Sequence, residues 1–138
     1  MDELRRILNA PDAPAGHILG ACIAAFASHA RDLKDLHLVE RHLGTFPSLL
    51  TAVNQTVGAS RFDEERASAF VEYLSGAGGD TLRPGITLAL ARWPAGQAKH
   101  YVQLLRAKNA SAFEAVVAAR KRIEEEIQRA AALQKRKQ

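Results

Sequence analysis

Residues 94–133 read PAGQAKHYVQLLRAKNASAFEAVVAARKRIEEEIQRAAAL, and this alanine-rich stretch holds two helix signals in succession. Pro94 suits the first turn of a helix, where its missing N–H needs no partner. Ala98, Val102 and Leu105 follow at three- and four-residue spacing, which is the period of one helix face. The sequence therefore predicts an amphipathic helix over residues 94–108.

A second helix is predicted by the capping box S-x-x-E, which runs from Ser111 to Glu114. In this motif the serine side chain accepts a hydrogen bond from the backbone of the glutamate, whose own side chain bonds back to the serine N–H. We expect this helix to continue for about twenty residues, to Leu133, and the basic residues 135–138 to form a frayed tail.

The same helical spacing recurs along the rest of the chain, and no stretch shows sustained period-2 alternation. With 138 residues, 47% of them hydrophobic and 25% charged, the chain has the size and composition of one ordinary globular domain. We predict an all-α fold with a single compact domain over residues 1–134. It is expected to be a helical bundle or orthogonal array of seven or eight short helices with a longer C-terminal helix.

Local signals set the expected boundaries of the earlier helices. Asp12 is a candidate N-cap for a helix whose first turn contains Pro14. Gly44 and Gly58 each follow an apolar helical pattern, so both are predicted to end a helix in the left-handed conformation. Residues 75–79, SGAGG, are predicted to form a flexible hinge.

Charge is distributed unevenly along the chain, whose net charge is +4. Residues 1–80 hold seven Lys/Arg against eleven Asp/Glu, a balance of −4, whereas residues 81–138 hold twelve against four, a balance of +8. No acidic residue occurs from Thr81 to Phe113. We therefore distinguish an acidic half, residues 1–80, from a basic half, residues 81–134, in which unopposed cations concentrate positive potential.

Motifs for catalysis are missing from the sequence. The glycine cluster at 76–79 lacks the final glycine of G-x-G-x-x-G and the Lys-Ser/Thr pair of a phosphate loop, and neither G-x-S-x-G nor H-E-x-x-H occurs. His37 and Glu40 form an i, i+3 pair that could support a metal ligand, but a surface hydrogen bond is the simpler interpretation. We expect a protein that is not an enzyme, with no catalytic residue, metal site or cofactor.

The single cysteine, Cys22, excludes an intrachain disulfide and is expected to be a small core residue. The acidic N-terminus does not resemble a secretory signal. The most apolar stretch, residues 18–27, has about half of the roughly 20 residues needed to cross a bilayer. These features predict a cytoplasmic protein with no membrane partner.

The basic half indicates contact with nucleic acid, DNA or RNA, through the phosphate backbone. Lys99 and Arg106 fall on one outward stripe of the helix over residues 94–108, and Trp93 or His100 could stack on bases. We expect a non-catalytic binding protein, such as a small subunit of a nucleoprotein complex. Its predicted site comprises Lys99, Arg106 and Lys108 at the centre, supported by Arg83, Arg92 and His100.

Two other interpretations stay open. The basic face could be merely solvated, with Trp93 as a core aromatic residue. Alternatively, the protein is an interaction adaptor or regulatory module that self-associates or docks a charged partner, using an apolar stripe that includes Val116, Ile123, Ile127 and Ala130.

Residues 120–122, RKR, each precede one of the glutamates 124–126 by four positions, so we also expect intrahelical ion pairs there.

Overall fold

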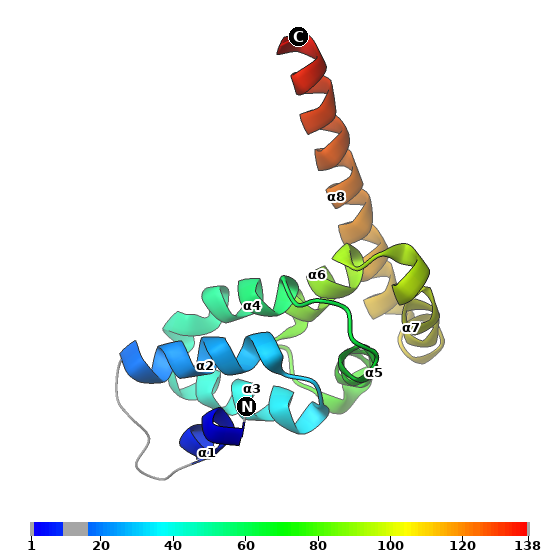
Figure 1. Cartoon of the computed structure of the whole chain (residues 1–138). Helices are drawn as coiled ribbons and strands as arrows, with labels where there is room; N and C mark the ends of the chain where they lie inside the picture. The colour runs from blue at the N-terminus through cyan, green and yellow to red at the C-terminus, as the bar shows by residue number, and fades with distance from the viewer. Residues whose placement is uncertain (1, 10–16, 138) are drawn as a thin grey trace.

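The computed structural model of the chain describes residues 2–9 and 17–137. Across these ranges it contains eight α-helices and no strand, which confirms the all-α prediction (Figure 1). Asp12 and Pro14, the predicted start of the second helix, lie outside the described residues. The helices are α1 Asp2–Asn9, α2 His17–His29, α3 Leu33–Thr45, α4 Leu50–Gly58, α5 Glu64–Glu72, α6 Arg83–Arg92, α7 Ala95–Lys108 and α8 Ala110–Lys137, with a 3₁₀ turn at Pro47–Leu49 and a π-helical turn at Tyr73–Ala77.

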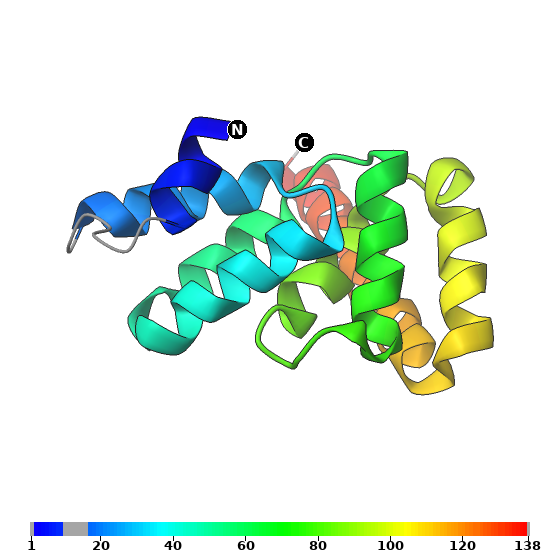
Figure 2. The same ribbon diagram turned by 90° about the horizontal axis from the view of Figure 1, so that it is seen from below.

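The first seven helices and the start of α8 form one body, from which the rest of α8 projects (Figure 1); seen from below, α8 lies behind the body (Figure 2). Helix α6 packs against both α4 and α8, and α7 packs against α5 and α8. Aromatic rings join these elements: Phe70 of α5 stacks on Trp93 with centroids 5.5 Å apart, and Phe62 meets the same indole edge-on at 5.4 Å. Burial of these rings fixes α5 and the α6–α7 junction in one core.

Helix α7 begins after Pro94, as the sequence predicts, and Ala98 and Leu105 are fully buried. The start of α8 differs from the prediction. The N-cap is Asn109, whose Oδ1 accepts a hydrogen bond from the backbone N–H of Ala112 at 3.2 Å, and not Ser111 of the capping box. The Asn109 amide also donates to the carbonyl of Leu74 at 2.8 Å, so this residue ties the helix start to the core.

Helix α8 is 28 residues long and continues to Lys137, so the predicted length of about twenty residues was too short. Residues 135–137, expected to form a frayed tail, are helical. No Gly or Pro occurs between Ala110 and Lys137, and the stretch is rich in Ala, Glu, Lys and Arg, which favour helix.

The two glycines predicted to end helices do not do so in the left-handed conformation. Gly44 lies within α3 and Gly58 is the last residue of α4, and the one positive φ among the described residues is 118°, at Gly76. A Cβ at Gly58 would lie 2.7 Å from Leu88 Cδ2. A side chain at Gly58 would therefore displace Leu88 where α4 and α6 approach closely.

The predicted hinge, residues 75–79, follows the buried Tyr73, and both Tyr73 and Gly79 form hydrogen bonds with other parts of the body. The hydroxyl of Tyr73 donates to the carboxylate of Glu40 in α3 and accepts a hydrogen bond from the backbone N–H of Leu82 at 2.9 Å. The N–H of Gly79 also donates to Glu40, at 3.2 Å. A side chain at Gly78 would overlap the Tyr73 ring, because a Cβ there would lie 2.1 Å from Cδ2.

Replacement of Tyr73 by phenylalanine should therefore destabilise the protein by about 1–3 kcal/mol. Tyr73 is fully buried, and this burial, reinforced by the hydrogen bond to Glu40, raises the pKa of its hydroxyl above the usual value and keeps it protonated. Without the hydroxyl, the buried N–H of Leu82 loses its acceptor. Urea denaturation of the full chain measures the change in the free energy of unfolding.

Tyr101→Phe is the matched control, because the Tyr101 hydroxyl forms no hydrogen bond with any residue that the structure describes and its ring is only partly buried. Its effect should stay within about 0.5 kcal/mol. Equal effects of the two substitutions would contradict a structural role for the Tyr73 hydroxyl.

Candidate nucleic-acid interface

Helices α7 and α8 enclose a groove of about 280 Å³ on the surface of the basic half. Both helices contribute apolar and cationic residues to its walls, and none of the described residues that line it is acidic. The lining residues are Ala95, Lys99, Val102, Gln103, Arg106, Phe113, Val116, Val117 and Arg120. We call this feature the α7–α8 groove.

One wall of the α7–α8 groove is the outward stripe that the sequence predicts for α7. Lys99, Gln103 and Arg106 are all exposed, at i, i+4 and i+7. The guanidinium of Arg106 lies over the ring of Phe113, 5.6 Å from its centroid. This cation–π contact orients Arg106 along the groove, because Phe113 is itself packed against the core.

The second wall contributes Arg120, which the sequence analysis did not place in the site. Its Nη2 donates to the carbonyl of Trp93 at 2.9 Å and lies 3.4 Å from the carbonyl of Leu90, so it satisfies the C-terminal end of α6. The predicted pairing of residues 120–122 with the glutamates at 124–126 is wrong, since no salt bridge joins them along α8. The i, i+4 spacing gave no sign of this tertiary contact.

Arg83 and Arg92 lie away from the α7–α8 groove. Arg83 begins α6 and forms a salt bridge with Asp80 at 3.1 Å, so its charge is compensated locally. Arg92, at the other end of α6, lines a neighbouring groove together with Glu124 and Glu126 of α8. Of the two supporting arginines, Arg92 is the nearer to the α7–α8 groove, because Arg120 lines both grooves.

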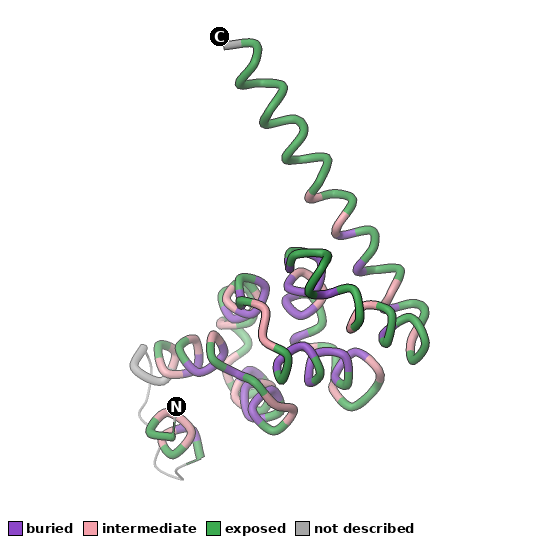
Figure 3. The backbone as a smooth tube through the Cα atoms, turned by 45° about the vertical axis from the view of Figure 1, so that its right-hand side comes forward, coloured by how far each residue is buried: buried purple, intermediate pink, exposed green. Residues whose placement is uncertain are grey.

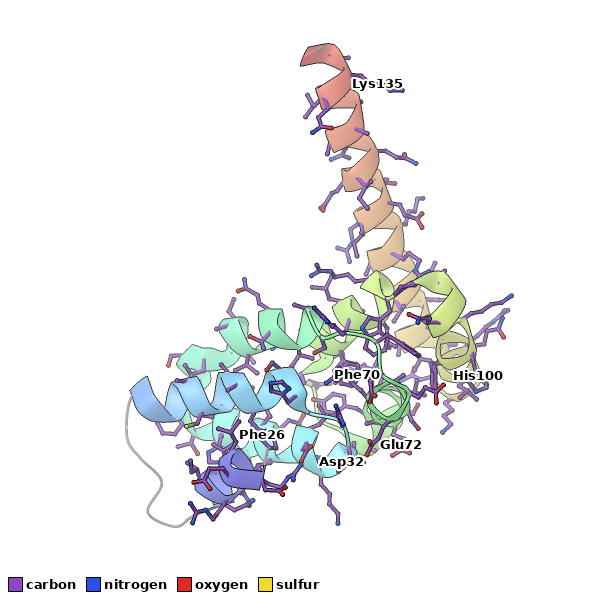
Figure 4. The ribbon with its side chains drawn as sticks, in the orientation of Figure 1. Phe26, Asp32, Phe70, Glu72, His100 and Lys135 are labelled. Atoms are coloured by element: carbon purple, nitrogen blue, oxygen red, sulfur yellow. The ribbon has the colours of Figure 1, made fainter. Side chains whose placement is uncertain are left out.

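His100 (Figure 4) is exposed on α7, and so is Lys108, but neither residue lines the groove. The His100 ring meets Tyr101 edge-on at 5.2 Å. Trp93, considered above for base stacking, is a core residue: it is 4% exposed, and its indole N–H donates to the carbonyl of Ser60 at 2.7 Å. The interpretation of Trp93 as a core aromatic residue is confirmed.

Both histidines of α3 have polar partners, one within α3 and one in α1. His37 Nδ1 lies 3.5 Å from the Glu40 carboxylate, as the i, i+3 spacing predicts, and His42 Nε2 lies 2.7 Å from the carbonyl of Leu8. Within residues 2–9 and 17–137, no three His, Cys, Asp or Glu side chains are grouped so that they could hold a metal ion. Cys22 is partly buried against the core.

A larger groove, of about 680 Å³, lies between α3, α4 and the start of α6. Leu43, Pro47, Leu50 and Leu88 give it an apolar surface, and Asp80 is its single charged lining residue. Its polar lining residues are Thr51, Asn54, Gln55, Asp80 and Thr81, and the Asn54 side chain is already hydrogen-bonded to the backbone of Thr81 and Gly85. For an anionic ligand the α7–α8 groove is the better candidate, because three cations line it and none lines the larger groove.

Comparison with known proteins finds no matching family model, no similar curated protein and no similar solved structure. None of the described helices combines the length and the apolarity that crossing a bilayer requires.

Proposed function

We propose that the protein binds nucleic acid through its phosphate backbone, along the α7–α8 groove. The observation that carries this proposal is the convergence of Lys99, Arg106 and Arg120 on one groove without an acidic lining residue. Cations that meet phosphates release condensed counterions, and this release drives binding that does not depend on sequence. In this proposal the protein binds without catalysis, as a small subunit of a nucleoprotein complex would.

The spacing of the cations also favours a polyanion over a single anion. Lys99 and Arg106 are seven residues apart on α7, about 10 Å along the helix axis. A duplex carries one phosphate charge per roughly 1.7 Å of its axis, so the two side chains face different phosphates. Arg120, held by the carbonyl of Trp93, adds a cation with little conformational freedom to lose on binding.

Fluorescence anisotropy with single- and double-stranded DNA and RNA, each in two unrelated sequences, tests this proposal. With about three phosphate contacts, affinity should fall roughly 30-fold between about 50 and about 200 mM salt. The two sequences of each ligand should bind alike, because backbone contacts carry no sequence information. No binding to any of the four ligands at the lower salt concentration would contradict the proposal.

A further inference from the structure

The second half of α8 extends beyond the body of the protein. Burial along this helix ends at Ile123, and every residue from 124 to 136 is exposed (Figure 3). Ile127 and Leu133, 63% and 57% exposed, are the two most exposed large hydrophobic side chains in the described part of the chain. We call residues 123–136 the α8 extension; Lys135 lies near its end (Figure 4).

The apolar seam by which α8 packs on the body continues along the extension. Ala112, Val116 and Ala119 are buried in the body, and Ile123 packs against its edge. At the same spacing the seam continues with Ile127, which is 63% exposed at the groove that Arg92 and Glu124 also line, and with the exposed Ala130. Helices in proteins are stabilised mainly by packing such a face, so the extension presents an interface that is only half used.

Charges on the extension indicate what covers this face. Glu124 and Glu125 precede Lys135 and Arg136 by eleven residues, which is close to three helical turns. Glu124 and Lys135 therefore lie on one flank of the seam. In an antiparallel pair of extensions that crosses near Ala130, Glu124 of each copy stands level with Lys135 of the other.

The same charges disfavour two other occupants. A parallel pair would set glutamates against glutamates and cations against cations, and like charges at such positions are destabilising. On the extension the three glutamates at 124–126 balance the three cations Arg129, Lys135 and Arg136, so it offers a phosphate backbone no excess of positive charge. A second copy in the antiparallel direction covers the seam and sets Glu124 level with Lys135.

We propose that two copies of the chain associate through antiparallel pairing of their α8 extensions, with Ile127 and Leu133 of each copy in contact across a two-fold axis near Ala130. Such an interface is isologous and closes at two copies. The overlap is about 20 Å long, which is short for a stable interface, so the dimer is weak and depends on concentration. The α7–α8 groove of each copy lies outside the pairing.

Sedimentation velocity of the full chain, freed of nucleic acid, tests this proposal between about 5 and about 500 µM. We expect a monomer–dimer equilibrium, and at least a tenfold higher dissociation constant for Ile127→Glu with an unchanged circular dichroism spectrum, since Ile127 is outside the core. A monomer at all concentrations, growth beyond two copies, or an unchanged equilibrium in Ile127→Glu would overturn the proposal.

Charge reversal distinguishes the two directions of pairing. Glu124→Lys with Glu125→Lys should weaken the dimer, and adding Lys135→Glu with Arg136→Glu in the same chain should restore it. A four-residue variant that stays monomeric would contradict antiparallel pairing. Because none of these residues lines the α7–α8 groove, nucleic-acid affinity of the monomer tests the proposed function separately.

Discussion

The double substitution of Lys99 and Arg106 by alanine is expected to weaken nucleic-acid binding roughly 30- to 150-fold at about 100 mM salt. Each side chain removed takes away one charged contact, worth about 1–1.5 kcal/mol, and the two sites are far enough apart for the losses to add. The slope of log affinity against log salt should flatten by roughly 1.5 to 2, and the loss should be similar for unrelated sequences. Anisotropy titrations at several salt concentrations measure both quantities.

A matched control separates the groove from the overall charge. Arg31→Ala with Lys34→Ala also removes two exposed cations. These residues lie at the α2–α3 junction and the start of α3, and neither of them lines the α7–α8 groove. Screening limits the effect of such distant charges, so affinity should change by less than about threefold. Equal losses in the two double variants would show that net charge alone drives binding, against the proposed site.

Gly85→Ala should destabilise the protein by about 3 kcal/mol, which lowers the melting temperature by roughly 10 °C. A Cβ at Gly85 would lie 2.7 Å from the backbone carbonyl oxygen of Asn54 and 2.8 Å from its Oδ1. The N–H of Gly85 donates to the same Oδ1 at 2.8 Å, so a shift that relieves the overlap breaks this hydrogen bond. Backbone atoms cannot rotate aside, and α4 and α6 must separate.

Gly44→Ala provides the opposite result with the same chemical change. Gly44 is helical, with no positive φ, and a Cβ there would have no neighbour within 4 Å. Alanine should stabilise the protein by about 0.5 kcal/mol, because it restricts the unfolded chain and favours helix. Thermal unfolding followed by circular dichroism measures both variants. Destabilisation by Gly44→Ala, or a tolerated Gly85→Ala, would contradict the packing described for these glycines.

The sequence predicted what depends on local periodicity. In α7, Pro94 marks the start, Ala98 and Leu105 are buried, and Lys99 and Arg106 are exposed, because a 3.6-residue period places each side chain without reference to other elements. The all-α class follows from the same repeated spacing.

Predictions failed where a distant residue decides the outcome. Asn109, and not Ser111, caps α8, and Asn109 also bonds to Leu74, 35 positions away. Gly58 has no left-handed conformation, and its missing side chain leaves room for Leu88. These choices depend on which helices meet, and a single helix's pattern does not contain that information.

For the candidate site, the sequence predicted one wall of the groove and missed the other. Lys99 and Arg106 share a stripe of α7, whereas Arg120 comes from α8 and is placed by the carbonyl of Trp93. Arg83 was assigned to the site on the acid-free run that begins at residue 81, but its salt-bridge partner, Asp80, lies one residue before that run. A one-dimensional charge count does not register this neighbour.

A titration of the isotope-labelled 15.0 kDa chain with a single-stranded oligonucleotide, followed by amide chemical shifts, tests the role of the α7–α8 groove most directly. The largest shifts are expected in α7 and the first half of α8, around Lys99, Arg106 and Arg120, and they should diminish as salt increases. Shifts confined to α1–α4 or to the α8 extension, or none at low salt, would contradict this role of the groove.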